Sequence, residues 1–130
     1  MRLFLLLTFL LVPLPALAQN IEEGAAGFAA HCAGCHGAEA AGDGPMAALL
    51  TVRPADLTGL AARNGGVFPT ARVVQRIDGT TDVMAHGGPM PIFGMLIQGP
   101  STAMLAPDGS EVIAPEAIVN IVAWLEGVQK

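Results

Sequence analysis

The residues most able to do chemistry lie together in one short stretch, Cys32-Ala33-Gly34-Cys35-His36. Two cysteines separated by two residues, with a histidine directly after the second, form the attachment signature of a c-type haem. Each sulfur must reach a vinyl group on neighbouring pyrrole rings, so both cysteines have to rise from one tight turn. The histidine then lies under the iron, where its imidazole can be the proximal ligand. Small Ala33 and Gly34 let the backbone approach the flat macrocycle closely.

Three other uses of a cysteine pair compete with haem attachment. A thioredoxin-like dithiol has the same spacing, but it needs a strand–helix setting that the sequence does not show. A zinc site needs a second pair of ligands, and the only other histidines are His31 and His86. A small structural disulfide stays open. Because the motif uses both cysteines of the chain, we interpret it as a covalent haem site, with Cys32 and Cys35 holding the haem and His36 binding its iron.

The first 18 residues predict a secretory signal peptide. Arg2 gives a positive start, residues 3–12 form an apolar run, and Ala16-Leu17-Ala18 has the small-x-small form of a cleavage site. A retained membrane anchor is the alternative. The apolar run is shorter than the roughly 20 residues of a spanning helix, and Pro13 and Pro15 break the stretch that follows it. We therefore expect cleavage after Ala18 and a mature domain of residues 19–130.

Export agrees with haem attachment, because the thioether bonds form after the chain has crossed the membrane. An exported cysteine pair would otherwise tend to form a disulfide. We expect a bacterial periplasmic protein, with the eukaryotic secretory pathway as the alternative. The formal net charge is −5, and the loss of Arg2 with the leader makes it more negative. This charge argues against a nucleic-acid partner and against binding to an anionic membrane by charge alone.

Helices are expected at both ends of the mature chain. Asn20 is a candidate N-cap for a helix that runs to about His31, with Glu23 placed as its capping-box partner. The last helix is expected to begin near Pro115, which suits the first helical position. It carries an apolar stripe with an aromatic residue at its edge: Ile118, Ile121, Val122 and Leu125, with Trp124.

Shorter elements are expected between these two helices. Residues 46–50 predict one short helix, and Asp56 or Thr58 caps another that ends at residues 64–66. Thr70 is expected to cap a helix over residues 71–77, with Asp78-Gly79 as its stop. Residues 80–110 show no sustained period and no strand alternation, so they predict a long loop that covers the second face of the haem.

The second iron ligand decides what the haem does. A haem with one protein ligand is open to small molecules, whereas a haem with two is suited to electron transfer. We choose Met90, because Pro89 and Pro91 stiffen the backbone on both sides, and its thioether opposite His36 raises the potential. His86 is the alternative and gives a bis-histidine haem of lower potential. The other candidates, which we interpret as packing residues, are Met46, Met84, Met95 and Met104.

The surroundings of the haem offer further candidates. The proximal imidazole needs a partner for its other nitrogen, and the carbonyl of Pro45 lies in a turn that is expected to pass beneath it. His31 is interpreted as a surface or haem-edge residue. Three arginines are candidates to pair with the haem propionates, although solvated surface positions are the default for each: Arg53, Arg72 and Arg76.

Together these residues resemble the class I cytochromes c of the bacterial monohaem type, over nearly all of the mature chain. The resemblance implies an all-α fold, with short helices around one covalently attached haem c and a cytochrome c domain at residues 19–130. It also implies that the first and last helices cross near Gly27, Phe28 and Trp124, that the iron has His and Met ligands, and that Pro45 supplies the proximal carbonyl. The matching pieces are residues 27–28, 32–37, 42–45, 56–57, 77–79, 86–87, 90–94 and 118–125.

The resemblance implies a one-electron carrier, not an enzyme, that docks briefly on a donor protein and an acceptor protein. The alternative is a haem subunit of a larger periplasmic oxidoreductase, in which the apolar stretch 96–110 forms an interface. A third possibility is a ligand-binding or peroxidase-like haem that is open at its sixth position. The acidic charge differs from that of the basic mitochondrial relatives, so their docking face is not transferred to this chain.

Overall fold

The computed structural model describes residues 19–80, 90–91 and 93–130. The predicted leader and the candidates Met84, His86 and Pro89 lie outside the described residues. No helix in the described part of the chain is both long enough and apolar enough to span a membrane. The elements in chain order are α1 (Ile21–His31), α2 (Ala33–His36), the 3₁₀ turns η1 (Ala47–Leu49) and η2 (Ala62–Asn64), α3 (Thr70–Asp78), β1 (Ser101–Leu105), β2 (Glu111–Pro115) and α4 (Glu116–Gly127).

The start of α1 follows the sequence prediction, with a change in partners. The Asn20 side chain accepts a hydrogen bond from the Glu23 N–H at 3.1 Å, as an N-cap does. The Asn20 N–H, however, donates to Oδ1 of Asn120 on α4 at 2.9 Å. The Asn120 Nδ2 donates in turn to the Glu23 carboxylate at 3.1 Å. The prediction of a capping box is therefore wrong, because α4 supplies the partner that Glu23 was expected to supply.

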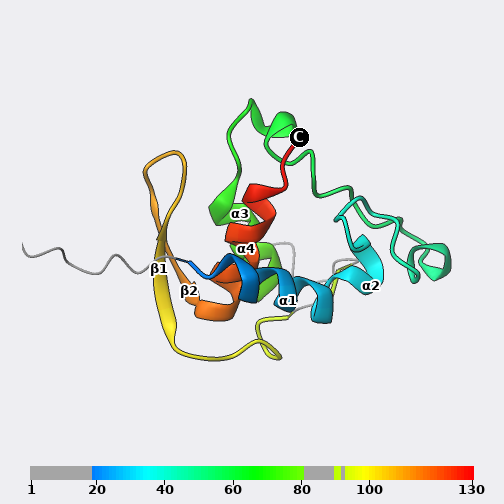
Figure 1. Ribbon diagram of the computed structural model, residues 1–130, viewed down its shortest axis with the longest axis horizontal. Coiled ribbons are helices and arrows are strands. Elements are labelled where there is room, and N and C mark those ends of the chain that lie inside the picture. The colour runs from blue at the N-terminus through cyan, green and yellow to red at the C-terminus, as the bar shows by residue number, and fades with distance from the viewer. Residues whose placement is uncertain (1–18, 81–89, 92) are drawn as a thin grey trace, which may run out of the picture.

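Small residues let α1 and α4 cross at close range (Figure 1). A Cβ on Gly24 would overlap the carbonyl oxygen of Asn120, and one on Gly27 would lie 3.0 Å from Cγ1 of Ile121. The ring centroids of Phe28 and Trp124 are 4.5 Å apart, with their planes tilted by 37°. The expected crossing near Gly27, Phe28 and Trp124 is thus confirmed. Gly24 is its tightest point.

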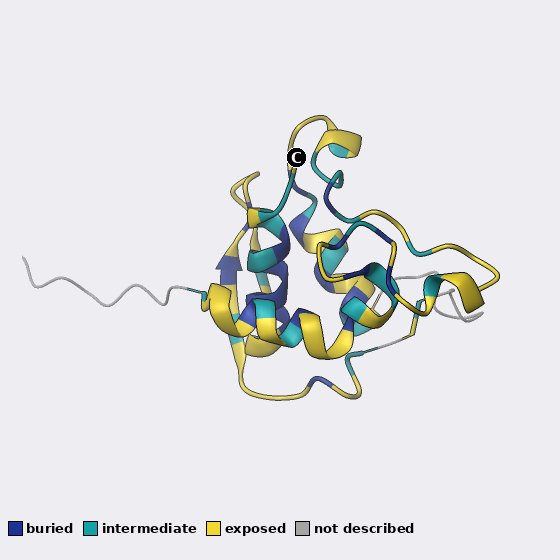
Figure 2. Ribbon diagram, turned by 45° about the vertical axis from the view of Figure 1, so that its right-hand side comes forward, coloured by how far each residue is buried: buried dark blue, intermediate teal, exposed yellow. Residues whose placement is uncertain are grey.

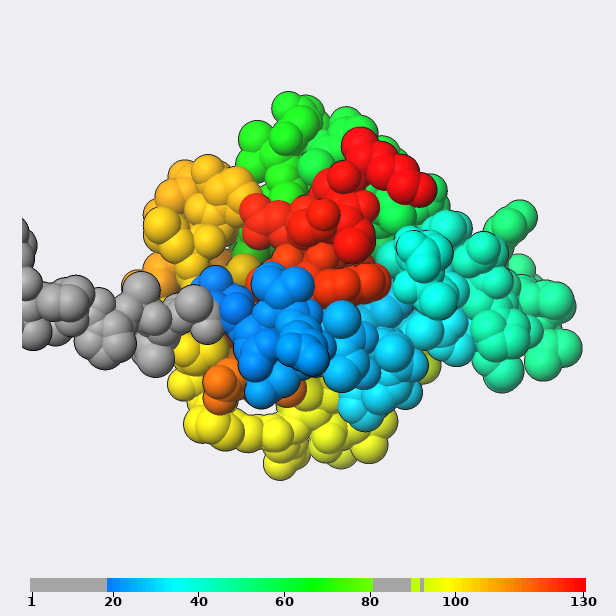
Figure 3. Space-filling model, viewed as in Figure 1, coloured from blue at the N-terminus to red at the C-terminus, as the bar shows by residue number. Residues whose placement is uncertain are grey.

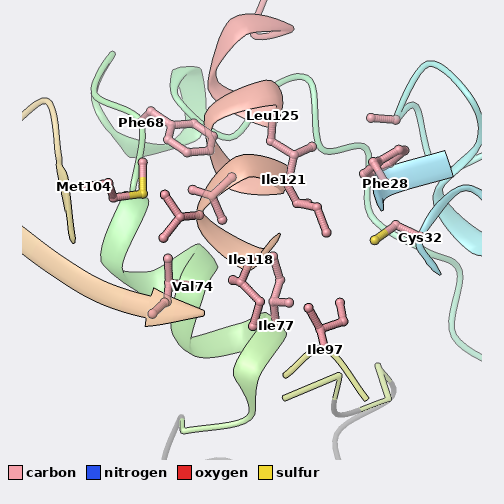
Figure 4. Close-up of a cluster of buried hydrophobic side chains, with 14 residues drawn as sticks. Phe28, Cys32, Phe68, Val74, Ile77, Ile97, Met104, Ile118, Ile121 and Leu125 are labelled. Atoms are coloured by element: carbon pink, nitrogen blue, oxygen red, sulfur yellow. The ribbon is translucent and has the colours of Figure 1, made fainter. Parts of the chain in front are cut away.

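The apolar core lies where α1, α3 and α4 meet (Figure 2). The stripe predicted on α4 is buried, and Trp124 at its edge is half-buried. Phe28 of α1 and Val74 of α3 reach the same cluster, as do Phe68 and Ile77 (Figure 4). The core therefore joins helices from the beginning, the middle and the end of the chain.

The middle elements differ in detail from those expected. Thr70 is the first residue of α3 and not its cap, and its buried hydroxyl makes no hydrogen bond with any described residue. Gly79, with φ of 85°, ends α3 in the left-handed conformation at the predicted stop. The two short helices expected before α3 are only 3₁₀ turns. Asp56 starts no helix, and its Oδ1 accepts from the N–H and hydroxyl of Thr58 at 2.8 and 2.6 Å in a local turn.

A two-stranded antiparallel hairpin, β1 and β2, occupies part of the region expected to be a loop. Met104 pairs with Val112 in its register, and Met104 is buried, whereas Leu105 and Ile113 are 72% and 69% exposed. Because apolar residues occupy both faces, the strands lack the usual alternation of apolar and polar residues. The expectation of an all-α fold is therefore wrong at this hairpin, and the fold is mostly helical.

Candidate haem site

The cysteine–histidine motif forms the one-turn helix α2, directly after α1. The Cys32 N–H donates to the Phe28 carbonyl at 2.8 Å and so closes α1, while the His36 N–H donates to the Cys32 carbonyl at 2.9 Å. Cys32 is buried, Cys35 is half-buried, and both are free thiols. A single helical turn therefore carries both sulfurs and the imidazole, which is the arrangement that attachment of a macrocycle requires.

Burial gives the Cys32 thiol an apolar setting. Desolvation raises its pKa to about 11, and the neighbouring Cys35 adds to the shift. Figure 4 shows Cys32 at the edge of the buried cluster, near Phe28. The thiol is protonated at neutral pH, whereas a reactive redox dithiol needs a thiolate. The setting disfavours a thioredoxin-like site and suits a sulfur that forms a neutral thioether.

The ring of His36 is held in a defined orientation. Its Nδ1 lies 2.9 Å from the backbone carbonyl oxygen of Ala55. A carbonyl oxygen only accepts, so Nδ1 is the donor, and in the neutral imidazole Nε2 then has the lone pair. Histidines that bind metals are oriented in the same way by a partner on the other nitrogen. The imidazole is therefore prepared to bind iron through Nε2.

The prediction that the Pro45 carbonyl bonds to His36 is wrong, because the carbonyl of Ala55 is the partner of His36 Nδ1. The loop 37–45 turns back onto α2, where the Gly44 N–H donates to the Cys35 carbonyl at 3.1 Å and the Met46 N–H donates to the Gly34 carbonyl at 2.9 Å. Pro45 is exposed between these two bonds. The predicted turn thus packs against the backbone of the motif instead of reaching its imidazole.

Ala55 reaches the imidazole because its segment packs on the loop 37–45. The Leu57 N–H donates to the carbonyl of Ala40 at 2.8 Å, and Ala40 is buried with a left-handed φ of 57°. A Cβ on Gly42 would lie 2.5 Å from the Pro54 carbonyl oxygen. The acceptor is a backbone atom of an alanine, so no side chain marks it in the sequence. In the sequence, only the neighbouring residues 56–57, which carry part of the family resemblance, pointed to the segment that contains this acceptor.

The segment of Met90 lies at the same end of α1 as the motif. Met90 is half-buried and packs against the core. The Phe93 N–H donates to the Ile77 carbonyl at the end of α3 at 3.0 Å. The ring centroid of Phe93 is 6.4 Å from that of His31, which directly precedes Cys32. The fold therefore fixes the chain after Met90 to the ends of α1 and α3, beside the start of α2.

The remaining predicted residues are three methionines, His31 and three arginines. Met104 is 4% exposed in the core, so its interpretation as packing is confirmed. Met46 and Met95 are 45% and 78% exposed, so the same interpretation is wrong for them. His31 is exposed, in agreement with a surface position. The three arginines considered for the propionates are also exposed: Arg53, Arg72 and Arg76.

A pocket among the described residues lies apart from the motif. It has a volume of about 220 Å³ and lies between α1, the start of α4 and residues 97–100, which bridge the lower side of the molecule in Figure 3. Glu23, His31 and Asn120 line it, whereas the motif cysteines and Met90 do not. Among the residues that the structure describes, no three histidine, cysteine or acidic side chains are grouped to hold a metal ion, so nothing there supports zinc.

The residues around the motif fit a flat apolar group bound through sulfur and imidazole. A Cβ on Gly44 would lie 2.5 Å from the Ala33 carbonyl, so the loop closes tightly on one side of α2, while Gly34 faces open space. Partly buried apolar side chains of α3 and of the segments before and after it pack against the core: Leu57, Leu60, Val73, Met90 and Phe93.

The comparison with protein families agrees with this arrangement. The family described as Cytochrome c matches residues 21–129, from the start of α1 into the segment after α4. Comparisons with curated proteins and with solved structures gave no match. The family match includes the motif, the His36 acceptor and the Met90 segment. The chain therefore belongs to the cytochrome c family, and its cofactor is a covalently attached haem c with iron.

Proposed function

We propose that this protein is an exported monohaem cytochrome c that carries single electrons between redox partners, with His36 and Met90 as its axial iron ligands. Family membership supports a haem-binding electron carrier. The observation that carries the proposal is the 2.9 Å hydrogen bond from His36 Nδ1 to Ala55, because it leaves Nε2 free for iron. The haem supplies the redox chemistry, and this chain binds it and sets its potential.

The proposed second ligand distinguishes a carrier from a ligand-binding haem. Met90 is half-buried, and the chain that follows it is anchored to α3 by the Phe93 N–H. With a thioether opposite His36, ferric protein should show the weak long-wavelength band of iron–sulfur ligation, and ferrous protein should not bind carbon monoxide. Carbon monoxide binding by the unmodified protein would favour the ligand-binding alternative.

We propose the periplasm as the place of action, since residues 1–18 have the form of a cleaved leader. The partners are a donor protein and an acceptor protein, and a carrier that turns over must bind each of them weakly. Recovery of haem-containing protein from the periplasmic fraction, with Gln19 as its first residue, tests both the compartment and the cleavage site.

A haem subunit of a larger periplasmic oxidoreductase is the second candidate. Exposed apolar side chains on the hairpin and in the segment before it favour this candidate, because a partner protein would cover them. They are Met95, Leu96, Leu105 and Ile113, each at least 69% exposed. Size-exclusion chromatography separates the two candidates: a free carrier elutes with the mass of one chain, whereas a subunit co-purifies from its host with a partner.

Covalent attachment is tested by removing one sulfur at a time. Cys32→Ala and Cys35→Ala should each lower the yield of holoprotein and shift the pyridine haemochrome spectrum to that of a haem with one thioether, because one vinyl group remains free. Thr51→Ala, at an exposed loop position, is the control and should leave both unchanged. An unchanged yield, with a haem that acid-acetone extracts, would contradict the assignment of the motif.

A further inference from the structure

The residues that follow α4 return to the segment beside His36. Figure 1 shows the end of the chain next to the loop that precedes α3. The Lys130 N–H donates to the Thr58 carbonyl at 2.9 Å. The Gln129 side chain reaches the same segment twice, because its Oε1 accepts from the Ala61 N–H and its Nε2 donates to the Leu57 carbonyl, each at 2.9 Å. The side chain therefore spans residues 57–61.

The amide of Gln129 has one arrangement that uses all its polar atoms. Besides Leu57, its Nε2 donates to the Leu125 carbonyl of α4 at 2.7 Å, so both N–H groups and the oxygen are bonded. If the oxygen and nitrogen of the amide exchanged places, the oxygen would face two carbonyl oxygens and the NH₂ group would face an N–H donor, so none of the three bonds could form. We call these three bonds the Gln129 brace, which ties α4 to residues 57–61.

Leu57 connects the Gln129 brace with the proximal side of the site. Its carbonyl accepts from Gln129, while its N–H donates to Ala40 at 2.8 Å. Ala55, two positions earlier, accepts from His36 Nδ1 at 2.9 Å. Asp56, between them, is held by its own bonds to Thr58. A short stretch of fixed backbone therefore separates the brace from the atom that orients the imidazole.

We infer that Gln129 is a positioning residue for the proximal histidine. By holding the Leu57 carbonyl, it fixes the place of the Ala55 carbonyl and so the strength of the His36 Nδ1–H hydrogen bond. This inference rests on the proposed role of His36 as an iron ligand. A strong bond at Nδ1 makes the imidazole a more basic ligand, and a more basic ligand stabilises ferric iron. Loss of the brace should weaken the bond and raise the reduction potential.

The test uses Gln129→Met, which keeps the length and nearly the volume of the side chain but removes all three hydrogen bonds. In holoprotein, two quantities are measured: the midpoint potential and, by ¹⁵N NMR of the ferrous form, the exchange rate of the His36 Nδ1 proton. We expect a higher potential than in the unmodified protein. The exchange of the His36 Nδ1 proton should be faster, by up to about fivefold, which corresponds to losing the whole net contribution of its hydrogen bond to Ala55.

Gln75→Met, at an exposed glutamine of α3, is the matched control and should change neither quantity. If Gln129→Met fails to fold, Gln129→Asn replaces it, since its amide is too short to span residues 57–61 and should shift both quantities in the same direction. A variant with a lower melting temperature but an unchanged potential and exchange rate overturns the inference. If the unmodified protein has no histidine-bound iron, the proposed function itself fails, and its own spectrum shows this before any Gln129 variant is made.

Discussion

Met90 and His36 would offer the iron unlike donor atoms, a soft sulfur and an imidazole nitrogen. Met90→His should keep a low-spin haem while lowering the reduction potential, because imidazole stabilises ferrous iron less than a thioether does. Met90→Ala should open the sixth position, so that the ferrous protein binds carbon monoxide. Visible spectra in both redox states and a potentiometric titration measure these changes.

Met95→Leu is the control for the Met90 variants. Met95 is 78% exposed, and the swap nearly conserves volume, so the spectrum should be unchanged and the cost in stability should be below about 1.5 kcal/mol. The assignment is wrong if Met90→Leu keeps the ferric spectrum of the unmodified protein while His86→Ala loses low-spin character. That pair of results would make the haem bis-histidine.

Asp56 makes the segment that holds His36 sensitive to acid. Hydrogen bonds from the hydroxyl and N–H of Thr58 lower the pKa of the Asp56 carboxyl below its ordinary 3.8, with smaller contributions from Lys130 and Arg63. The unfolded chain therefore binds this proton more readily. The stability gained from these bonds is present above pH 3.8 and is lost as the pH falls through the lowered pKa.

Asp56→Asn should accordingly reduce the pH dependence of stability on the acid side. Urea unfolding of the holoprotein, measured above and below pH 3.8, gives the slope of the unfolding free energy for the variant and the unmodified protein. Glu39→Gln, at an exposed loop position, serves as the control. Equal slopes for Asp56→Asn and the unmodified protein would contradict the role of this carboxylate.

At the scale of elements, the close crossing of α1 and α4 requires glycine, which has no side chain, at position 24. Gly24→Ala would place a Cβ on the Asn120 carbonyl oxygen, so the helices must separate, and we expect a loss of about 3 kcal/mol in unfolding free energy. Gly127→Ala is the matched control, since nothing lies within 4 Å of a Cβ there, and it should change stability by less than about 1 kcal/mol. Similar melting temperatures for the two variants would refute the close contact.

The elements that the sequence predicts well are those with local signals. Asn20 caps α1, Gly79 ends α3, and the apolar stripe of α4 faces the core, because caps, stops and periodic stripes depend on residues a few positions apart. The haem motif is also local, since five consecutive residues carry its whole pattern.

What the sequence does not predict depends on contacts across the chain. The hairpin is not recognisable in the sequence, because Leu105 and Ile113 place apolar side chains on its exposed face. Asn120 replaces the capping-box partner from 100 positions away. The acceptor for His36 is a carbonyl 19 positions along, and every residue type has such a carbonyl. The packing of the folded chain alone decides which of these atoms form hydrogen bonds with one another.

At the scale of the whole molecule, we expect the haem-free chain to be largely unfolded. The helices α1, α3 and α4 have 11, 9 and 12 residues, and isolated helices shorter than about 12–15 residues are marginal in water. A small domain therefore needs the apolar contacts of the macrocycle to complete its core. The double variant Cys32→Ala/Cys35→Ala, prepared without haem, should give a weak helical circular dichroism signal, with the holoprotein as control. Well-dispersed NMR spectra of the haem-free variant would contradict this expectation.

The crossing of α1 and α4 also implies an order in which the parts of the chain can fold during export. On the proposed export route the chain emerges with its N-terminal end first, so Cys32 and Cys35 reach the far side of the membrane well before α4 does. During that interval α1 has no helix to pack against, and Gly24 and Gly27 weaken it further. The motif is therefore expected to be unfolded while α4 is still crossing the membrane. Because the complete haem-free chain is also expected to be largely unfolded, we expect α1 and α4 to close on each other only after the haem has been joined to the two cysteines.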